Sequence, residues 1–215
     1  MFKEKKYEVI KNAISYELAN FVYNYLLLRR DASKFIYEKN ISIEGMHYGT
    51  WKDPQVPDVY SEYSDMVMET LMMKCLPVLE EKTGFSLVPN YSYTRVYEKG
   101  SILKRHKDRK SCEISTTLNL GGDEWPIFID PTGTNSVIDE YKNIHKPNAP
   151  LGDRIVLEPG DMLIYSGCEL EHWREEFEGD ICGQVFLHYN SIKEEHNTNV
   201  FDGRPILGIK HWMIE

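Results

Sequence analysis

The spacing of apolar residues changes from a helical period to a period of two at about residue 85. In "SYELANFVYNYLLLRR", Ser15 is placed as an N-cap, and one helix face is formed by Leu18, Phe21, Val22, Tyr25 and Leu26. In "SDMVMETLMMKCLPVLEEKTG", a second stripe comprises Met68, Leu71, Met72, Cys75 and Leu79. This second helix should kink or break at Pro77 and end at Gly84. Residues 1–84 are therefore expected to be mainly helical, with an ordered loop "MHYGTWKDPQVPDVY" between the helices.

Alternating segments dominate the rest of the chain. "NYSYTRVY" places Arg95 and Tyr97 on one strand face, and "CEISTTLNL" places Ser115, Thr117 and Asn119 on one face. Four more strands are predicted in "WPIFID", "DRIVL", "DMLIY" and "CGQVFLHY". Helices followed by many short strands predict an α+β, mainly β fold with an antiparallel jelly roll. The polar segment 131–153 is predicted to be an insertion between strands.

Composition narrows the class of protein. A chain of 215 residues with 41% hydrophobic and 27% charged residues is typical of one soluble globular domain. Its net charge of −9 argues against nucleic acid as a partner. The four cysteines form no metal-binding pair and are expected to be reduced thiols that are either buried or without a role. No signal peptide or membrane-spanning run is visible, so we expect a cytoplasmic protein without a membrane partner. The oligomeric state stays open.

A cluster of basic residues surrounds a His-x-Asp pair in "LKRHKDRK". His106 and Asp108 could supply two ligands of a metal site that uses two histidines and one carboxylate. The third ligand could be His145, His172 or His188. His145 lies in the polar insertion, and His188 is interpreted as a core or pocket-lining residue, whereas His172 directly follows a predicted strand, turn and strand. His172 is therefore the preferred third ligand, and the basic cluster is interpreted as the rim of an active-site mouth that attracts an anion.

Two segments, "YEKGSILKRHKD" and "PGDMLIYSGCELEHW", resemble the Fe(II)/2-oxoglutarate-dependent dioxygenases of the prolyl 4-hydroxylase-like branch. That family has Tyr-x-x-Gly before its His-x-Asp and Gly-Asp-x-Leu-x-Phe/Tyr before its distal histidine. The matching positions are Tyr97, Gly100, His106, Asp108, Gly160, Asp161, Leu163, Tyr165 and His172. The similarity extends over about residues 90–190. It implies a double-stranded β-helix with the N-terminal helices packed on its major sheet.

The resemblance also implies an activity and a division of the chain. His106, Asp108 and His172 would be catalytic ligands of Fe(II), which with 2-oxoglutarate and O2 hydroxylates a substrate and releases succinate and CO2. One domain would span residues 1–215, with a helical part at 1–84, a jelly-roll core at 85–190 and a tail at 191–215. The substrate is expected to be a small molecule or a peptide, for example peptidyl proline. A lid over it would come from the loop 41–60 and the insertion 131–153.

The residue that anchors the cosubstrate departs from the family pattern. The far carboxylate of 2-oxoglutarate needs a buried cation, which this family places about ten residues after the distal histidine. The stretch "GDICGQVFLHY" contains neither Arg nor Lys. Arg174, two residues after His172, is the preferred substitute, and Arg95 is the alternative. The resemblance nominates Tyr97 and Thr117 as hydroxyl donors to the cosubstrate.

Two other functions are compatible with the same three ligands. The chain could be a cupin-like protein that binds a metal or a small ligand without turnover. It could also be a zinc hydrolase, which would need a general base near an activated water. Two histidines and a carboxylate with open coordination positions suit iron better than either alternative.

Overall fold

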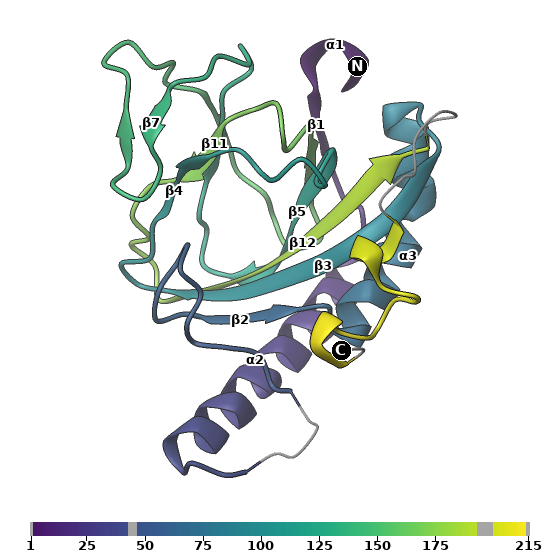
Figure 1. The fold of residues 1–215 in the computed structure, drawn as a ribbon, viewed down its shortest axis with the longest axis vertical. Helices are drawn as coiled ribbons and strands as arrows, with labels where there is room; N and C mark the ends of the chain where they lie inside the picture. The colour runs from purple at the N-terminus through teal and green to yellow at the C-terminus, as the bar shows by residue number, and fades with distance from the viewer. Residues whose placement is uncertain (1, 43–46, 193–199, 214–215) are drawn as a thin grey trace.

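A computed structural model describes residues 2–42, 47–192 and 200–213 (Figure 1). The helical elements are α1 (Phe2–Lys5), α2 (Tyr16–Glu38), α3 (Met66–Thr83), and the 3-10 turns η1 (Val200–Gly203) and η2 (His211–Met213). The strands are β1 (Tyr7–Ile10), β2 (Tyr60–Tyr63), β3 (Leu87–Glu98), β4 (Leu103–His106), β5 (Ile114–Gly122), β6 (Ile127–Ile129), β7 (Val137–Asp139), β8 (Ile144–His145), β9 (Asp153–Ile155), β10 (Met162–Tyr165), β11 (His172–Arg174) and β12 (Ile181–Ser191). The chain is thus mainly β, as the alternating segments predict.

Two antiparallel sheets form the body of the molecule. The larger sheet has six strands in the order β1-β10-β5-β12-β3-β2, and the smaller one has four in the order β4-β11-β6-β9. Apolar side chains from the two sheets pack together, for example Ile127 and Ile129 of β6 with Leu163 of β10. The strands β7 and β8 of the insertion pair separately, beside the smaller sheet (Figure 1).

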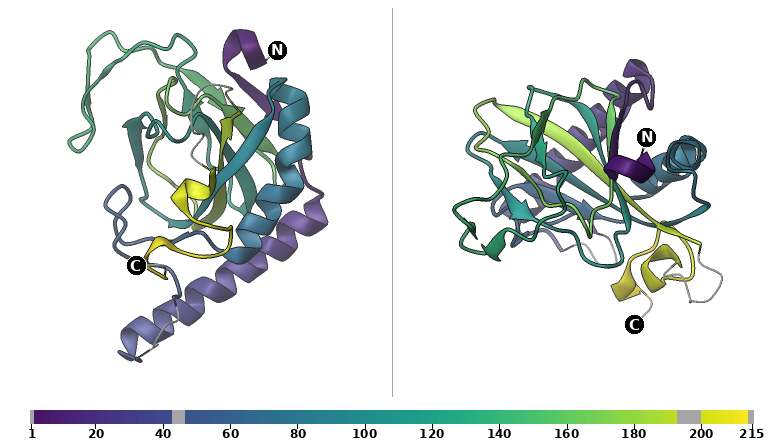
Figure 2. Two further views of the ribbon diagram at one scale, coloured as in Figure 1. Left: turned by 45° about the vertical axis from the view of Figure 1, so that its right-hand side comes forward. Right: turned by 90° about the horizontal axis from the view of Figure 1, so that it is seen from above.

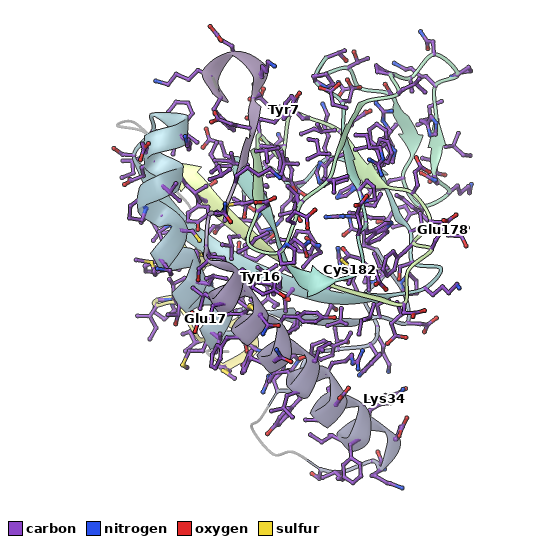
Figure 3. All side chains as sticks on the ribbon, turned by 180° about the vertical axis from the view of Figure 1, so that it is seen from behind. Tyr7, Tyr16, Glu17, Lys34, Glu178 and Cys182 are labelled. Atoms are coloured by element: carbon purple, nitrogen blue, oxygen red, sulfur yellow. The ribbon has the colours of Figure 1, made fainter. Side chains whose placement is uncertain are left out.

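The helices α2 and α3 cover the outer face of the larger sheet (Figure 2). The buried helical side chains that pack on this face are Ala19, Val22, Leu26, Met68, Leu71, Met72, Cys75 and Leu79. Ser15 caps α2 by accepting a hydrogen bond from Leu18 N, and Gly84 ends α3 in the left-handed conformation. Figure 3 shows the length of α2, with Tyr16 and Lys34 labelled near its opposite ends. No helix among the described residues has the length and apolar character needed to cross a membrane.

The structure departs from three expectations about the N-terminal part. Pro77 does not break α3, and because this residue is exposed, water can bond the backbone carbonyl that the proline leaves without a partner. Phe21 is 68% exposed, because the buried stripe of α2 runs through Ala19, Val22 and Leu26 instead. The segment expected to be helix and loop also contributes β1 and β2, which form the two edges of the larger sheet.

The two faces of strand β5 border the apolar core under the helices and the space between the two sheets. Ile114 and Leu118 pack in the core under the helices, as expected from the alternation. Ser115 and Thr117 point the opposite way, where they bond to Asp108 and Gln184 respectively. The space between the sheets is therefore partly polar, and the candidate site lies there.

Candidate metal centre

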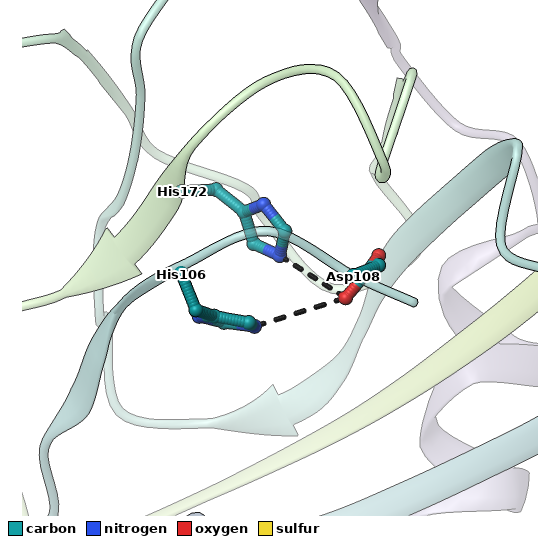
Figure 4. Close-up of side chains that lie close together, drawn as sticks. All are labelled: His106, Asp108 and His172. Atoms are coloured by element: carbon teal, nitrogen blue, oxygen red, sulfur yellow. Dashed lines mark ion pairs between the residues drawn. The ribbon is translucent and has the colours of Figure 1, made fainter. Parts of the chain in front are cut away.

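Two neighbouring strands of the smaller sheet bring the predicted ligands together. His106 ends β4, His172 begins β11, and these two residues are direct partners in the antiparallel ladder. Asp108 Oδ1 lies 3.7 Å from His106 Nε2 and 3.5 Å from His172 Nε2. One ligand atom from each of the three residues can be chosen so that all lie within 4.8 Å of one another. Figure 4 shows the two imidazoles converging on the carboxylate.

Backbone carbonyls fix the orientation of both imidazoles. The Nδ1 of His106 is 2.7 Å from the carbonyl oxygen of Lys104, and the Nδ1 of His172 is 3.0 Å from that of Leu170. A carbonyl only accepts, so each Nδ1 carries the hydrogen and each Nε2 presents its lone pair to the space near Asp108. Burial, with the nearby His172, lowers the pKa of His106 to about 3, which keeps this ring neutral and able to bind a metal.

Asp108 is held as a carboxylate. Burial by itself raises the pKa of Asp108, but interactions with His172, His188 and His106 outweigh it and hold this pKa well below its ordinary value. Its backbone N–H donates to the carbonyl of Gly167 at 2.9 Å, and its Oδ2 accepts a hydrogen bond of 2.6 Å from Ser115 Oγ. The site therefore combines two imidazoles with one charged oxygen ligand.

A cavity of about 250 Å³ opens onto this centre. Besides the three candidate ligands, its lining comprises Asp53, Gln55, Tyr91, Tyr93, Arg95, Leu103, Ile127, Tyr165, Phe186 and His188. His188, interpreted from the sequence as a core or pocket-lining residue, is both: it is 5% exposed and faces this cavity.

Arg174 is a deeply buried cation. It is 1% exposed, and no ion pair joins it to an acidic group in the described part of the chain. Its Nη2 lies 3.3 Å from Thr117 Oγ1, and its Nη1 donates to the carbonyl of Trp125. Its Nε has no hydrogen-bond partner among the described residues. Burial therefore lowers the pKa of Arg174, since its charge is poorly compensated.

Arg95 has the opposite character. Its Nε donates to Asp53 Oδ2 at 2.7 Å, and its Nη2 donates to Gln55 Oε1 at 2.6 Å. Asp53 also accepts a hydrogen bond from Tyr93 at 2.9 Å, so this cluster ties the loop before β2 to strand β3. Arg95 lines the cavity, but its charge is already neutralised by Asp53.

Arg174 and the two predicted hydroxyl donors lie together, outside the lining of this cavity. Thr117 bonds Gln184 Oε1 at 3.1 Å and faces Arg174. Tyr97 is fully buried against Trp125 and lies near Arg174. Tyr165 connects this region to the metal centre, because its hydroxyl is 3.4 Å from His172 Nε2 and it also interacts with Arg174.

The basic cluster is only partly a rim. Arg105 is buried between Asp130 and Glu171, at 2.6 and 2.7 Å, and its Nη1 donates to the carbonyl of Pro150 in the insertion at 2.6 Å, so it does not face the mouth. Arg109 pairs with Asp202 at 2.7 Å. Lys107 bonds Asn135 in the insertion. Within the described part of the chain, Arg105 and Arg109 are therefore paired with carboxylates, and the lysines of the cluster are not.

Three contributors to the site had weak sequence signals. Ser115 shared a predicted polar face with Thr117, but the alternation alone does not say which hydroxyl meets Asp108. Gly167 lies after the predicted strand of Tyr165, and a Cβ there would overlap Ser115 and Asp108. Asp53 lies in a loop, whose path over strand β3 no local pattern predicts.

The comparisons with known proteins concern the fold. No family model matches the sequence, and no curated protein matches it either. A prolyl-4-hydroxylase from Pseudomonas putida aligns with a TM-score of 0.57 and 13% identity, covering 89% of this chain and 96% of that one. HygX from Streptomyces hygroscopicus, solved with nickel, 2-oxoglutarate and hygromycin B, aligns with a TM-score of 0.59 and 13% identity, covering 88% and 84%. SnoK, a non-heme alpha ketoglutarate dependent carbocyclase from nogalamycin biosynthesis, aligns with a TM-score of 0.59 and 14% identity, covering 96% and 89%. The chain therefore shares the fold of these proteins.

Proposed function

We propose that this protein is an Fe(II)- and 2-oxoglutarate-dependent dioxygenase that hydroxylates a small-molecule or peptide substrate and releases succinate and CO2. The observation that carries the proposal is Arg174, which is buried, has no acidic partner among the described residues, and lies two residues after the candidate ligand His172 on β11. A cosubstrate with one carboxylate at the metal and another further in requires such a cation.

The residues of the site fit both iron(II) and 2-oxoglutarate. Two imidazole Nε2 atoms and one carboxylate oxygen form the donor set that non-heme iron(II) prefers, and this set leaves coordination positions open. The unpartnered Nε of Arg174 fits the far carboxylate of 2-oxoglutarate, because a guanidinium binds a carboxylate through two parallel hydrogen bonds. The structural neighbours add support, since HygX was solved with 2-oxoglutarate bound.

The bound iron and 2-oxoglutarate would supply the oxidising power that inserts one oxygen atom from O2 into a substrate C–H bond. The residues of the chain provide placement. His106, Asp108 and His172 would hold the metal. Arg174 would orient the cosubstrate, with Thr117 beside it and the buried hydroxyl of Tyr97 nearby.

The cavity wall combines polar and apolar side chains. Leu103 and Phe186 contribute apolar surface beside the candidate ligands. Burial keeps the pKa of Tyr165 well above its ordinary value, so its hydroxyl stays protonated beside His172.

The same proposal extends to the fold and the lid. We infer that the two facing sheets form a double-stranded β-helix and that residues 1–215 make one oxygenase domain. Asp53 and Gln55 from the predicted lid loop line the cavity, although residues 43–46 of that loop lie outside the described part. From the insertion, Glu140 and Tyr141 line a second, adjacent hollow of about 140 Å³ together with Gln55. These two segments would contact the substrate on either side of the opening.

Metal titration tests the proposal first. We expect the purified protein to bind one iron(II) under anaerobic conditions, and His106→Ala or His172→Ala to weaken this binding strongly. The metal-loaded protein should then bind 2-oxoglutarate much more tightly than the metal-free protein. Near-native iron affinity in either variant would exclude this set of ligands.

A further inference from the structure

The two carboxylate oxygens of Asp108 have different environments. Oδ1 faces both imidazoles, at 3.7 Å from His106 Nε2 and 3.5 Å from His172 Nε2. Oδ2 instead accepts a hydrogen bond of 2.6 Å from Ser115 Oγ. The carboxylate therefore presents one oxygen to the candidate metal position, while the protein binds the other.

A second residue stands behind Ser115. The Nδ1 of His188 lies 3.0 Å from Ser115 Oγ, and the His188 ring packs on Tyr91 with centroids 4.5 Å apart. A carboxylate only accepts, so the single hydroxyl hydrogen of Ser115 is used for Asp108, whose oxygen is much closer than the carbonyl of Cys112 at 3.4 Å. The bond to His188 must then run the other way, with Nδ1–H donating to Ser115 Oγ.

The backbone leaves this arrangement little freedom. Asp108 N donates to the carbonyl of Gly167 at 2.9 Å. A Cβ on Gly167 would overlap both Ser115 Oγ and Asp108 Oδ2, so only glycine lets the chain pass this close to the pair. Ser115 is fully buried and His188 is 5% exposed, which shields the hydrogen bonds from competing water.

We propose that Ser115 and His188 are positioning residues that restrict Asp108 to one metal contact, through Oδ1. This inference rests on the proposed metal site and deepens it. A carboxylate that bound through both oxygens would occupy two coordination positions. With two histidines present, it would leave too few for a cosubstrate that chelates the metal and for O2. The hydrogen bond on Oδ2 prevents this second contact.

Titration of the metal-stripped full-length protein with Co(II) tests the proposal, because the visible spectrum of Co(II) reports the number and arrangement of its ligands. Ser115→Ala should weaken Co(II) binding about 10- to 100-fold and change the spectrum. Ser92→Ala is the matched control. Ser92 is an equally buried serine on strand β3, and its hydroxyl has no hydrogen-bond partner among the described residues. This control should bind Co(II) with the affinity and spectrum of the wild type.

Two substitutions of His188 keep the test valid if Ser115→Ala folds poorly. His188→Phe retains a ring against Tyr91 but removes the donor, and it should weaken binding and alter the spectrum. His188→Asn places an amide N–H near the position of Nδ1 and should restore most of the affinity. If His188 only filled space, His188→Asn would not bind Co(II) more tightly than His188→Phe.

The outcomes separate the two proposals. A wild-type protein that binds no Co(II) would overturn the metal site itself. Wild-type binding with unchanged affinity and spectrum in Ser115→Ala and His188→Phe would overturn the positioning role alone.

Discussion

Replacing Arg174 by methionine should separate cosubstrate binding from protein stability. Methionine fills a similar volume without a charge. The guanidinium of Arg174 is buried, lacks an acidic partner among the described residues, and has an unbonded Nε. We expect Arg174→Met to leave the free energy of unfolding of the cosubstrate-free protein unchanged or higher, because an uncompensated buried charge is removed.

The same Arg174→Met substitution should strongly weaken the binding of 2-oxoglutarate. Loss of one member of a buried charge pair costs about 2–5 kcal/mol, which corresponds to roughly 30- to several-thousand-fold in affinity. Arg174→Lys should recover only part of this loss, because an ammonium cannot make the planar two-pronged contact. Metal affinity should stay close to that of the wild type, since Arg174 contacts none of the three ligands.

Arg95→Met is the control with the reverse pattern. Its guanidinium is neutralised by Asp53 at 2.7 Å, so the substitution leaves a buried carboxylate unpaired. We expect a loss of about 3–5 kcal/mol in the free energy of unfolding, or roughly 6–20 °C in Tm for a chain of this length. Its effect on 2-oxoglutarate affinity should be mild.

Anaerobic calorimetry with the metal-loaded protein and thermal unfolding without cosubstrate measure both quantities. The fluorescence of Trp125, whose ring lies 5.0 Å from the Arg174 guanidinium carbon, offers a second readout of binding. Tight 2-oxoglutarate binding by Arg174→Met, together with its loss in Arg95→Met, would reverse the assignment. Unchanged tight binding in both variants would refute both anchors, and no binding by the metal-loaded wild type would refute the cosubstrate itself.

Three further predictions concern other parts of the molecule. Burial raises the pKa of Glu62, but interactions with His47, Lys210 and Arg29 outweigh it and lower this pKa to about 2. The ionised Glu62 should therefore stabilise the folded protein by on the order of 3 kcal/mol at any pH above its unfolded pKa near 4.5. This stabilisation should be lost as the pH falls from 4.5 toward 2. The Tm of the wild type should fall across that pH window, and the Tm of Glu62→Gln should fall much less, because it should already be reduced near neutral pH. If the two curves of Tm against pH run parallel, Glu62 does not provide this stabilisation. Gly167→Ala should weaken Co(II) binding at least 10-fold, because the added methyl displaces Asp108, and wild-type affinity would refute the close approach. Leu79→Ala should cost about 2–5 kcal/mol in chemical denaturation with metal affinity unchanged, and a smaller loss would mean that the helix-to-sheet core is looser than its full burial indicates.

Much of the fold follows from local patterns. The stripe from Met68 to Leu79 and the cap at Ser15 correctly predict α3 and the start of α2, because apolar spacing and capping act over a few residues. The alternation around Ser115 and Thr117 gives the faces of β5 correctly for the same reason. Strand β1 is only four residues long and joins the sheet through β10, so its identity depends on a partner more than 150 residues away.

Local sequence patterns likewise predict some residues of the site and not others. His106 and Asp108 lie two residues apart on one strand end, and the motif around His172 predicts its strand, so their convergence was accessible from sequence. Arg105 looked like its basic neighbours, yet it is buried against Asp130 and Glu171, which no local pattern indicates. The distinction between Arg174 and Arg95 likewise depends on which acidic side chain lies nearby, and this is a property of the folded chain.

The proposed activity is tested most directly by incubating the iron-loaded protein with 2-oxoglutarate labelled at its first carboxyl carbon and measuring the released CO2 in the presence of O2. The account predicts iron-dependent CO2 release with an equal amount of succinate, abolished in His172→Ala and strongly reduced in Arg174→Met. Protein that is shown to hold both iron and 2-oxoglutarate, yet releases no more CO2 than His172→Ala, would contradict it.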